Sequence, residues 1–562
     1  MSRRARHAAL PTRTASGNSF YVYRPNPLTE NQRVARAIAL AGNPRIRAIV
    51  DGLAKPTGRP RCVSMPLLLR LLFLHALSEP ARMTLASVES TVIGLSAHSR
   101  RLLEIPADWL SDPDARRMLY RRIWSTFNDL ALATRDGIHV DHDHVLRVNV
   151  DTGEVDPCSS GCPAMDLTAD EVHTTFVQAA LPRRFRRSKF LAGDGTDLES
   201  FGVPYFNGER APDGRVCADP DARWGKRTPT DRRPSEHYVG YELHLATYVA
   251  AVGHEEGPRV CAGMAMRPGV QDRSGAARAL MLAVKRFGPV TEAILDRGYT
   301  TAKASNFAGP MRALGIEVTM DLHASQRGTH PGPAPGTFWL DGHLYSEAMP
   351  AGLRELQPPR IGDSGGTKAR IRDQFDAREA YRFTAHSRHD GFGKQRFKGP
   401  ALAGHVRCPN NPASMRLGAH VPTTTCTPSQ QCGCGITVMI SDTEHQRDRQ
   451  RLPWQSNPWE LSYNRRTYAE TLNSRIRFND ANLNRGFIQV LSRHATALLV
   501  AIYLAAFNTI ELHRWHTRRG ERDPWAIELK ERPDSRPLGR HTRSVKHHHR
   551  GPPGQDATAS TI

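Results

Sequence analysis

The sequence predicts a mixed α/β fold that is preceded by an all-α domain and interrupted by a β-rich insertion. Residues 27–137 place their apolar positions at helical spacing. Within residues 187–322, strand-like apolar runs come first and then alternate with helical segments, which is typical of a mixed sheet with helices. Residues 323–458 are rich in glycine and proline and contain short strand-like runs. A chain of 562 residues is long enough for several such domains.

The N-terminal part divides into an arm and a helical domain. Residues 1–26 are basic and lack periodicity, which predicts a disordered arm. Thr29 and Ser64 precede helical patterns and are expected to be N-caps. Four arginines share one expected helix at residues 114–132: Arg116, Arg117, Arg121 and Arg122. This cluster is either part of a DNA-binding domain or a solvated basic face.

The centre of the chain begins with residues 138–186, which have little pattern and are predicted to be a linker. The elements expected after it are, in chain order, strands at 189–194, 241–249 and 260–266, a helix at 274–287, a strand at 290–296, a helix at 301–314 and a strand at 318–322. A structureless loop as long as residues 323–458 is implausible in a compact domain, so we expect a folded β-rich insertion there.

The C-terminal part is expected to complete the sheet domain. Residues 459–516 predict two helices, at 461–478 and 487–512. Residues 517–562 are charged and end in a basic segment with three consecutive histidines, which predicts a disordered tail.

Four polar residues near the C-terminal end follow a helical spacing. Tyr463, Arg466, Glu470 and Arg477 form the pattern Y-x2-R-x3-E-x6-[K/R]. At about 100° per residue, the four side chains share one stripe roughly 60° wide. A carboxylate, two guanidiniums and a phenol make a poor core face, but they suit the binding of a divalent metal and of phosphate.

This spacing resembles the Y-R-E-K signature of bacterial insertion-sequence transposases of the DDE class. The chain departs from the signature at Arg477, where the family usually has lysine, and this keeps the charge but changes the donor geometry. The resemblance implies an RNase H-like fold and two further acids on strands. Asp194 in D-G-T and Asp296 in D-R-G-Y each end an apolar run and are similar to those acids. Asp197 is the competing candidate for the first position, although Asp194 ends the run directly.

The resemblance implies a DNA transposase that cuts the ends of its insertion sequence and joins them to target DNA. Asp194, Asp296 and Glu470 would hold two Mg²⁺ or Mn²⁺ ions, because two-metal phosphodiester chemistry needs acidic oxygens around both ions. Tyr463, Arg466 and Arg477 would bind DNA phosphates. Two alternatives stay open, a non-transposing RNase H-like nuclease and a DNA-binding protein that kept the fold but lost catalysis.

Composition indicates a polyanionic partner. The chain has 77 Lys and Arg against 56 Asp and Glu, a net charge of +21 and an isoelectric point near 10.0. The expected partners are therefore double-stranded DNA, as terminal inverted repeats and target, and a second copy in the DNA complex. We expect no membrane association, because the most apolar stretch, residues 65–77, is short and contains Arg70 and His75. Nine cysteines and the lack of a signal peptide favour the bacterial cytoplasm, in association with the nucleoid.

The insertion contains two further candidate features. The resemblance implies that Trp339 stacks on a DNA base, and the alternative is burial in the insertion's own core. Cys408, Cys426, Cys432 and Cys434 have the spacing C-x17-C-x5-C-x-C. Four thiolates would suit a structural Zn²⁺ site. However, the spacing is not that of a standard zinc ribbon and the final C-x-C is tight, so unrelated buried thiols are the alternative.

Overall fold

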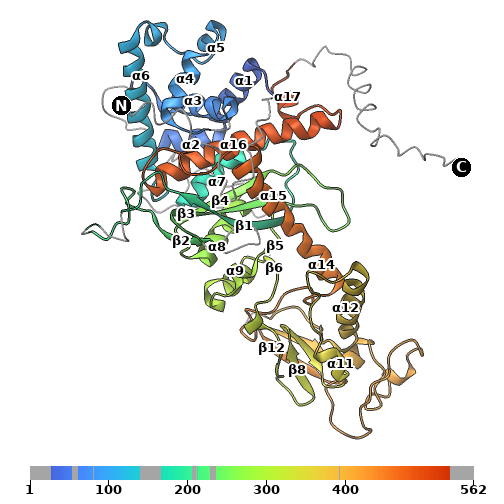
Figure 1. Cartoon of the computed structure of the whole chain (residues 1–562). Helices are drawn as coiled ribbons and strands as arrows, with labels where there is room; N and C mark the ends of the chain where they lie inside the picture. Colours follow the sequence, from blue (N-terminus) through green and yellow to red (C-terminus); the bar gives the residue numbers. More distant parts are fainter. Residues whose placement is uncertain are drawn as a thin grey trace, which may run out of the picture.

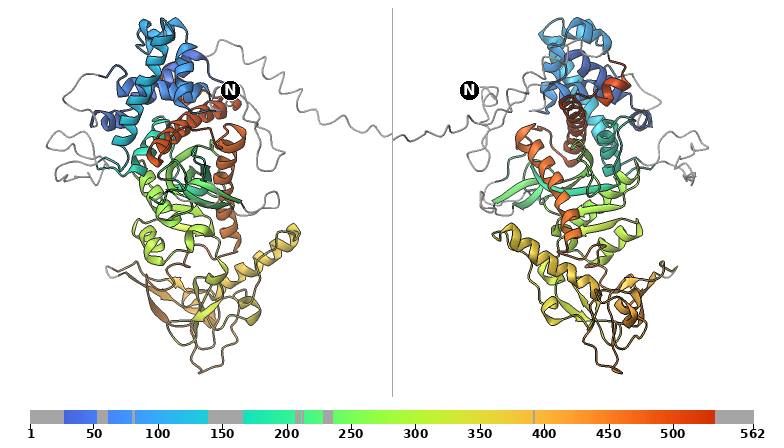
Figure 2. Two further views of the ribbon diagram at one scale, coloured as in Figure 1. Left: turned by 60° about the vertical axis from the view of Figure 1, so that its left-hand side comes forward. Right: turned by 90° about the vertical axis from the view of Figure 1, so that its right-hand side faces the viewer.

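The computed structural model describes residues 27–52, 61–79, 82–138, 166–205, 211, 213–227, 236–390 and 393–531. The described chain is elongated (Figures 1 and 2), with a helical domain at one end, a central sheet domain, and a small lobe at the other end. The arm predicted at residues 1–26 lies outside the described residues, as does the histidine run at 547–549.

The helical domain forms where apolar spacing predicts helices. Thr29 caps the first helix through a reciprocal pair of hydrogen bonds with Gln32, and the Ser64 side chain accepts from the Leu67 backbone N–H at the start of the third, so both predicted N-caps are confirmed. The helices are α1 (Glu30–Ala41), α2 (Pro44–Gly52), α3 (Met65–Ser78), α4 (Leu85–Ile93), α5 (Ala97–Leu102) and α6 (Pro113–Ala133). Arg116, Arg117 and Arg121 on α6 are exposed, so this face is open to solvent.

The prediction of a linker at residues 138–186 is wrong for the part that the structure describes. α7 (Ala169–Ala179) occupies it, and residues 139–165 lie outside the described residues. Thr168 and Glu171 form a capping box at its start, and Val172, Phe176 and Val177 are fully buried. Their apolar side chains bury against the sheet, so a short helix is stable where the sequence pattern alone is weak.

The central sheet has antiparallel strands followed by parallel ones. Its strands are β1 (Phe190–Glu199), β2 (Arg223–Arg227), β3 (Glu236–Tyr248), β4 (Cys261–Pro268), β5 (Glu292–Leu295) and β6 (Glu317–Met320). β3 pairs antiparallel with β1 on one side and with β4 and β2 on the other, whereas β1, β5 and β6 run parallel. α8 (Arg273–Lys285) connects β4 to β5, and α9 (Arg297–Thr300) and α10 (Ala308–Ala313) lead to β6. The predicted strands and the helix predicted at 274–287 are thus present, with β2 as an additional strand. The helix predicted at 301–314 is present only as α10, after a 3₁₀ turn at Ala304–Asn306.

One long helix joins the helical domain to the sheet domain. α16 (Arg493–Arg518) packs against α3, α7 and β4 (Figure 1), and its residues from Ala495 to Leu512 are all buried. Among the described helices it alone is long and apolar enough to cross a membrane, but its whole apolar window is buried inside the protein. It is therefore the central core helix.

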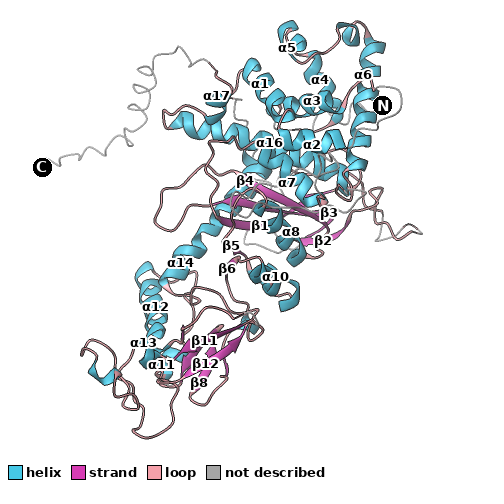
Figure 3. Cartoon of the chain, turned by 180° about the vertical axis from the view of Figure 1, so that it is seen from behind, coloured by secondary structure: helices cyan, strands magenta, loops and turns pink. Residues whose placement is uncertain are grey.

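The insertion folds into a lobe with two small sheets, seen apart from the central sheet in Figure 3. One sheet contains β7 (Thr329–Pro331), β8 (Thr337–Leu340) and β9 (His343–Ser346), and the other contains β10 (Thr384–Ala385), β11 (Lys394–Lys398) and β12 (Thr437–Ser441). The helices are α11 (Ala351–Arg354), α12 (Gly365–Ala377) and α13 (Pro400–Ala403). The strands agree with the expected β-rich insertion, whereas α12 was not expected.

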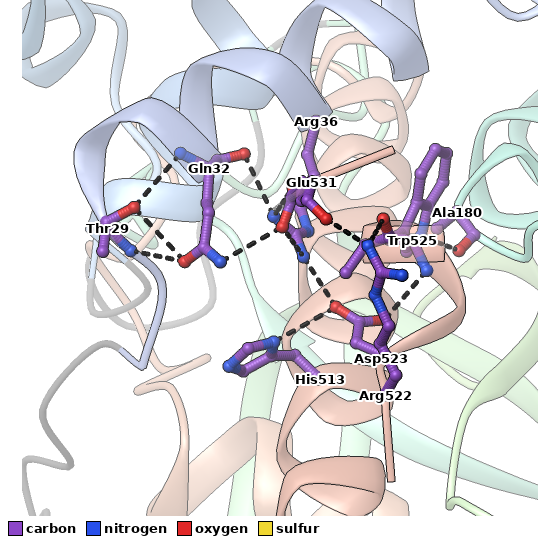
Figure 4. Close-up of polar contacts among 10 residues, drawn as sticks. Thr29, Gln32, Arg36, Ala180, His513, Arg522, Asp523, Trp525 and Glu531 are labelled. Atoms are coloured by element: carbon purple, nitrogen blue, oxygen red, sulfur yellow. Dashed lines mark hydrogen bonds and ion pairs between the residues drawn. The ribbon is translucent and has the colours of Figure 1, made fainter. Parts of the chain in front are cut away.

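The disordered tail was predicted to begin at residue 517, but folded structure continues beyond that residue. α16 continues to Arg518, and α17 (Pro524–Glu528) follows it. The fully buried Arg36 of α1 forms ion pairs with Asp523 and Glu531, each at 2.6 Å, as Figure 4 shows. Trp525 is also buried, and its indole N–H donates to the Ala180 carbonyl at 2.9 Å. Buried contacts therefore hold residues as far as Glu531 on the helical domain.

Candidate active site

Two acids lie next to each other where the parallel pairing of two neighbouring strands ends. The pairing of β1 with β5 aligns Gly193 with Leu295, and the next residue along each segment is an acid: Asp194 within β1, which continues to Glu199, and Asp296 directly after β5. A side chain at Gly193 would lie 2.7 Å from the Leu295 Cδ2 atom, so glycine allows the two strands to pack closely here. The strand register thus brings the two predicted acids together.

The third predicted acid comes from a helix. α15 (Thr467–Ser474) packs on β1 and carries Glu470. Asp194, Asp296 and Glu470 line one open cavity of about 590 Å³. Its wall also contains five basic residues: Lys226, Arg227, Arg273, Arg466 and Arg477. Residues far apart in the sequence therefore form one acidic site with a basic rim.

The helix that carries Glu470 is not one regular α-helix. α14 (Asn457–Tyr463) continues as a 3₁₀ turn (Asn464–Arg466), then as α15, and then as a π-helical segment (Arg475–Asn479). Each change of pitch shifts the following side chains around the axis, so the stripe expected for a uniform helix does not hold for all four positions. Arg466, Glu470 and Arg477 line the cavity.

Tyr463 lies behind the cavity wall rather than in it. Its ring stacks on Trp459 with a centroid distance of 4.7 Å, and the Arg466 guanidinium lies 5.5 Å from the Tyr463 ring centroid. Arg466 also forms an ion pair with Glu470 at 2.7 Å. In this structure Tyr463 supports Arg466, and its binding to DNA stays a prediction.

The buried Asp194 carboxylate carries an electrostatic strain. Burial raises the pKa of Asp194 to about 6, although Arg466 and the Gly195 backbone N–H oppose this shift. The charge of Asp296 raises the pKa further, which agrees with two carboxylates in one site. Asn473 Nδ2 donates to the Asp194 Oδ2 atom at 2.9 Å. A cation bound at this position would relieve the cost of the buried charge.

Asp197, the competing candidate, is already neutralised by two guanidiniums. Its carboxylate lies 2.5 Å from Arg477 and 2.5 Å from Arg227. Burial acts to raise the pKa of Asp197, but these two arginines lower it below the usual value. A carboxylate held in this way has no free charge for a metal, so the geometry favours Asp194.

The sequence analysis missed two polar residues of the cavity. Asn473 follows Glu470 by one helical turn, so the spacing that predicts Glu470 could also have indicated Asn473. Glu242 lies opposite Asp197 in the pairing of β1 with β3, and Arg273 binds it at 2.8 Å. No local sequence signal marks Glu242, because it lies within a continuous buried strand.

Trp339 is placed far from this cavity, in a small core of the lobe. Its side chain is 3% exposed and packs with Leu344, Phe383 and Ile440, and its ring centroid lies 4.7 Å from that of His445. The structure favours the packing alternative for Trp339, and base stacking stays a prediction.

The four candidate cysteines of the lobe come together. The Sγ atoms of Cys408, Cys426, Cys432 and Cys434 all lie within 4.8 Å of one another. The distance is 3.7 Å both between Cys408 and Cys432 and between Cys426 and Cys434. This cluster could bind a metal such as zinc, whereas unrelated thiols would lie apart.

Comparison with known proteins finds no matching family model, no similar curated protein and no similar solved structure. The case for a function therefore depends on the arrangement of the residues themselves.

Proposed function

We propose that the protein is a DNA transposase of the DDE class. The observation that carries this proposal is that Asp194, Asp296 and Glu470 line one cavity, the first two directly after the paired stretch of β1 and β5 and the third on a packed helix. The order of the sheet, with antiparallel strands before parallel ones, is consistent with the RNase H-like fold that the Y-R-E-K resemblance implies.

The donor set of the cavity suits hard divalent cations. Mg²⁺ and Mn²⁺ prefer oxygen ligands, and the carboxylates of Asp194, Asp296 and Glu470 supply them. Two such ions, when bound, would activate the attacking water or 3′-hydroxyl and stabilise the leaving oxygen. The raised pKa of Asp194 supports a cation site, because the buried carboxylate is poorly compensated by its protein neighbours.

Arg466 and Glu470 neutralise each other through their 2.7 Å ion pair. If Glu470 were to bind a metal, its ion pair with Arg466 would be broken. The Arg466 guanidinium could then donate two parallel N–H groups to a DNA phosphate. Arg477 stays bound to Asp197 and keeps β1 against the helix that carries Glu470. The side chains thus divide into an acid group for the metals, Arg466 for phosphate, and Arg477 for alignment.

The remaining expectations follow from this function. The net charge of +21 supports binding of duplex DNA, with the exposed arginines of α6 as a candidate surface. We propose a homodimer in the DNA complex, in the bacterial cytoplasm with the nucleoid. For the four-cysteine cluster we propose Zn²⁺ in a structural role, separate from the reaction.

The test uses a duplex that carries the terminal inverted repeat found beside the gene. The purified chain should cleave this end in Mg²⁺ or Mn²⁺ and join it to a target plasmid. Glu470→Gln should abolish both products but still retard the duplex in a gel, because it keeps the shape and the basic contacts. Cleavage by Glu470→Gln at the wild-type rate would refute the proposal, and cut ends without joined products would indicate a plain nuclease.

A further inference from the structure

We infer that the four cysteines of the lobe bind one Zn²⁺ ion as a tetrathiolate, and that this ion holds residues 399–436 in their fold. In a tetrahedral site with Zn–S bonds of about 2.3 Å, neighbouring sulfurs are roughly 3.8 Å apart. The two closest Sγ pairs in the lobe are at 3.7 Å, and all four Sγ atoms lie within 4.8 Å. The thiols thus already occupy positions close to the corners of such a tetrahedron.

The backbone brings the four thiols together through specific contacts. The segment before Cys408 pairs with the segment before Cys426, since Arg407 N–H donates to the Pro422 carbonyl and Thr424 N–H donates to the Arg407 carbonyl, both at 2.8 Å. Gly433 separates Cys432 from Cys434, and a Cβ atom at Gly433 would lie only 2.2 Å from the Gly336 carbonyl oxygen. Glycine at position 433 therefore lets the tight C-x-C turn pass close to Gly336, which directly precedes β8. The sulfurs of Cys432 and Cys434 can then reach the same centre.

Polar donors surround the sulfurs, as they do around thiolate ligands of metals. Asn410 Nδ2 lies 3.6 Å from the Cys432 Sγ atom, and Ser346 Oγ lies 3.2 Å from that of Cys434. The charge of the segment also fits. A Zn²⁺ ion with four thiolates carries a net charge of −2, and the sequence from 391 to 441 contains no Asp or Glu but has five Lys and Arg residues: Lys394, Arg396, Lys398, Arg407 and Arg416.

The lobe has little else to hold this segment. Residues 399–436, all of which the structure describes, contain only α13 and one 3₁₀ turn as regular structure. Cys408 and Cys434 belong to the main core of the lobe with Phe338 and Tyr345. A metal that links four points of this segment would replace the regular hydrogen bonding and the larger core that it lacks. Folding of the segment is therefore coupled to zinc.

The test compares the full chain with two cysteine variants, all purified without a metal-affinity step. The wild type and Cys62→Ser, which changes an exposed cysteine outside the cluster, should each retain about one zinc per chain by elemental analysis. The half-buried Cys432→Ser should lose most of it, and limited proteolysis should then cut within residues 399–436 while the helical domain stays intact.

A second measurement on the wild type does not depend on folding of a variant. Release of zinc by a chelator should make four additional thiols reactive, out of the nine in the chain. Equal zinc in the wild type and Cys432→Ser, iron in place of zinc, or four cluster thiols that react freely before chelation would overturn the inference.

A different observation carries a second inference, which rests on the proposed function. Asn473 is 8% exposed, and its amide group donates to Asp194. The Asn473 Oδ1 atom is buried and has no hydrogen-bond partner among the described residues. A buried amide oxygen without a partner is costly unless a ligand satisfies it. We propose that Asn473 positions the Asp194 carboxylate and supplies a neutral oxygen ligand to a divalent metal at the acids.

Binding of Mn²⁺ to the DNA-free chain tests this role without any activity assay. Asn473→Ala should weaken Mn²⁺ binding by about 10–100-fold, as expected for a group that orients a metal ligand. Asn473→Asp should restore binding, and Thr471→Ala, a change of a half-buried residue on the same helix that does not line the cavity, should have no effect.

Two results would contradict the role of Asn473 in different ways. Wild-type Mn²⁺ affinity in Asn473→Ala would overturn the inference and leave the proposed function in place. A wild-type chain that binds no Mn²⁺ would overturn the inference and the proposed function together.

Discussion

The Arg477 guanidinium lies 2.5 Å from the Asp197 carboxylate, and this ion pair connects the strand that carries Asp194 to the helical segment that follows Glu470. Arg477 Nη1 also lies 3.3 Å from the Thr196 hydroxyl. The pair therefore fixes the distance between two of the three acids. Asp197 and Asp194 are close in sequence and lie on one strand. Asp197 holds this strand against the helical segment, whereas Asp194 is available to bind a cation.

Replacement of these two aspartates should change stability in opposite directions. Burial raises the pKa of Asp194 from its usual value near 3.8 to about 6, so its ionisation costs the folded state up to about 3 kcal/mol at high pH. Stability from this group is present below about pH 4 and is lost as pH rises through about 6. Asp194→Asn should therefore raise the melting temperature at pH 8 without added divalent metal, and the gain should shrink at pH 5.

Asp197→Asn provides the matched comparison. Its pKa is lowered, so its charge stabilises the folded state above the usual aspartate pKa, and its loss leaves Arg227 and Arg477 without their shared partner. The variant should melt at a lower temperature at pH 8. Calorimetry in buffer free of chelator measures both, since a chelator would also remove zinc. Two variants that both destabilise the chain at pH 8 would contradict the assignment of Asp194 as the strained acid.

Arg477→Ala should destabilise the sheet domain by about 2–3 kcal/mol. The removal of one partner of a buried ion pair is costly, although Asp197 keeps Arg227 and so the loss should fall at the low end of the usual range. Arg477→Lys should lose less, because it keeps the charge but not the planar donor group. Urea unfolding measures the difference. If DNA affinity falls in Arg477→Ala while stability is unchanged, Arg477 binds phosphate instead of aligning the site.

Trp339→Ala should loosen the lobe and leave the acid cavity unchanged. Its 3% exposed side chain fills a small core, and truncation of a buried Trp typically costs about 3–5 kcal/mol. Proteolysis of the lobe should accelerate, whereas Mn²⁺ binding should stay as in the wild type. If Trp339→Ala is as stable as the wild type and leaves a 2-aminopurine signal at the cleaved DNA end unchanged, Trp339 has neither the packing role nor the base-stacking role.

Two acids that end apolar runs, and a third acid placed by helical spacing, were enough to predict the candidate site. Asp194 and Asp296 end apolar runs that become β1 and β5, and Glu470 lies on a helix as expected. Parallel pairing of the two strands then aligns the acids, and sequence order alone does not specify such pairing. The ion pair of Asp197 with Arg477 likewise joins residues 280 positions apart, so no local pattern indicates it.

Other parts of the fold could not be read from local pattern because tertiary contacts decide them. α7 has only eleven residues, and its stability depends on the burial of Phe176, whose ring centroid lies 6.3 Å from that of Phe73 on α3. The pitch changes around Glu470 turn Tyr463 out of the cavity wall, whereas a uniform 100° rotation places it with the other three. The cysteine spacing resembled no standard site, and only the close passage of Gly433 against Gly336 shows how the C-x-C turn is accommodated.

The last prediction concerns the segment that was expected to be part of a tail. Arg36 is fully buried on α1 and relies on Asp523 and Glu531 for its charge, while His513 Nδ1 lies 3.1 Å from Asp523 (Figure 4). A chain that ends at Arg518 would leave the Arg36 guanidinium buried without either carboxylate, which should cost about 3–5 kcal/mol. A chain that ends at Glu531 keeps both carboxylates and should melt like the full-length protein. Arg36→Met in the shorter chain should recover part of the loss, because it removes the unpaired charge but keeps much of the side-chain volume. Equal melting temperatures for the chains ending at 518 and 531 would show that the helical domain does not need this contact.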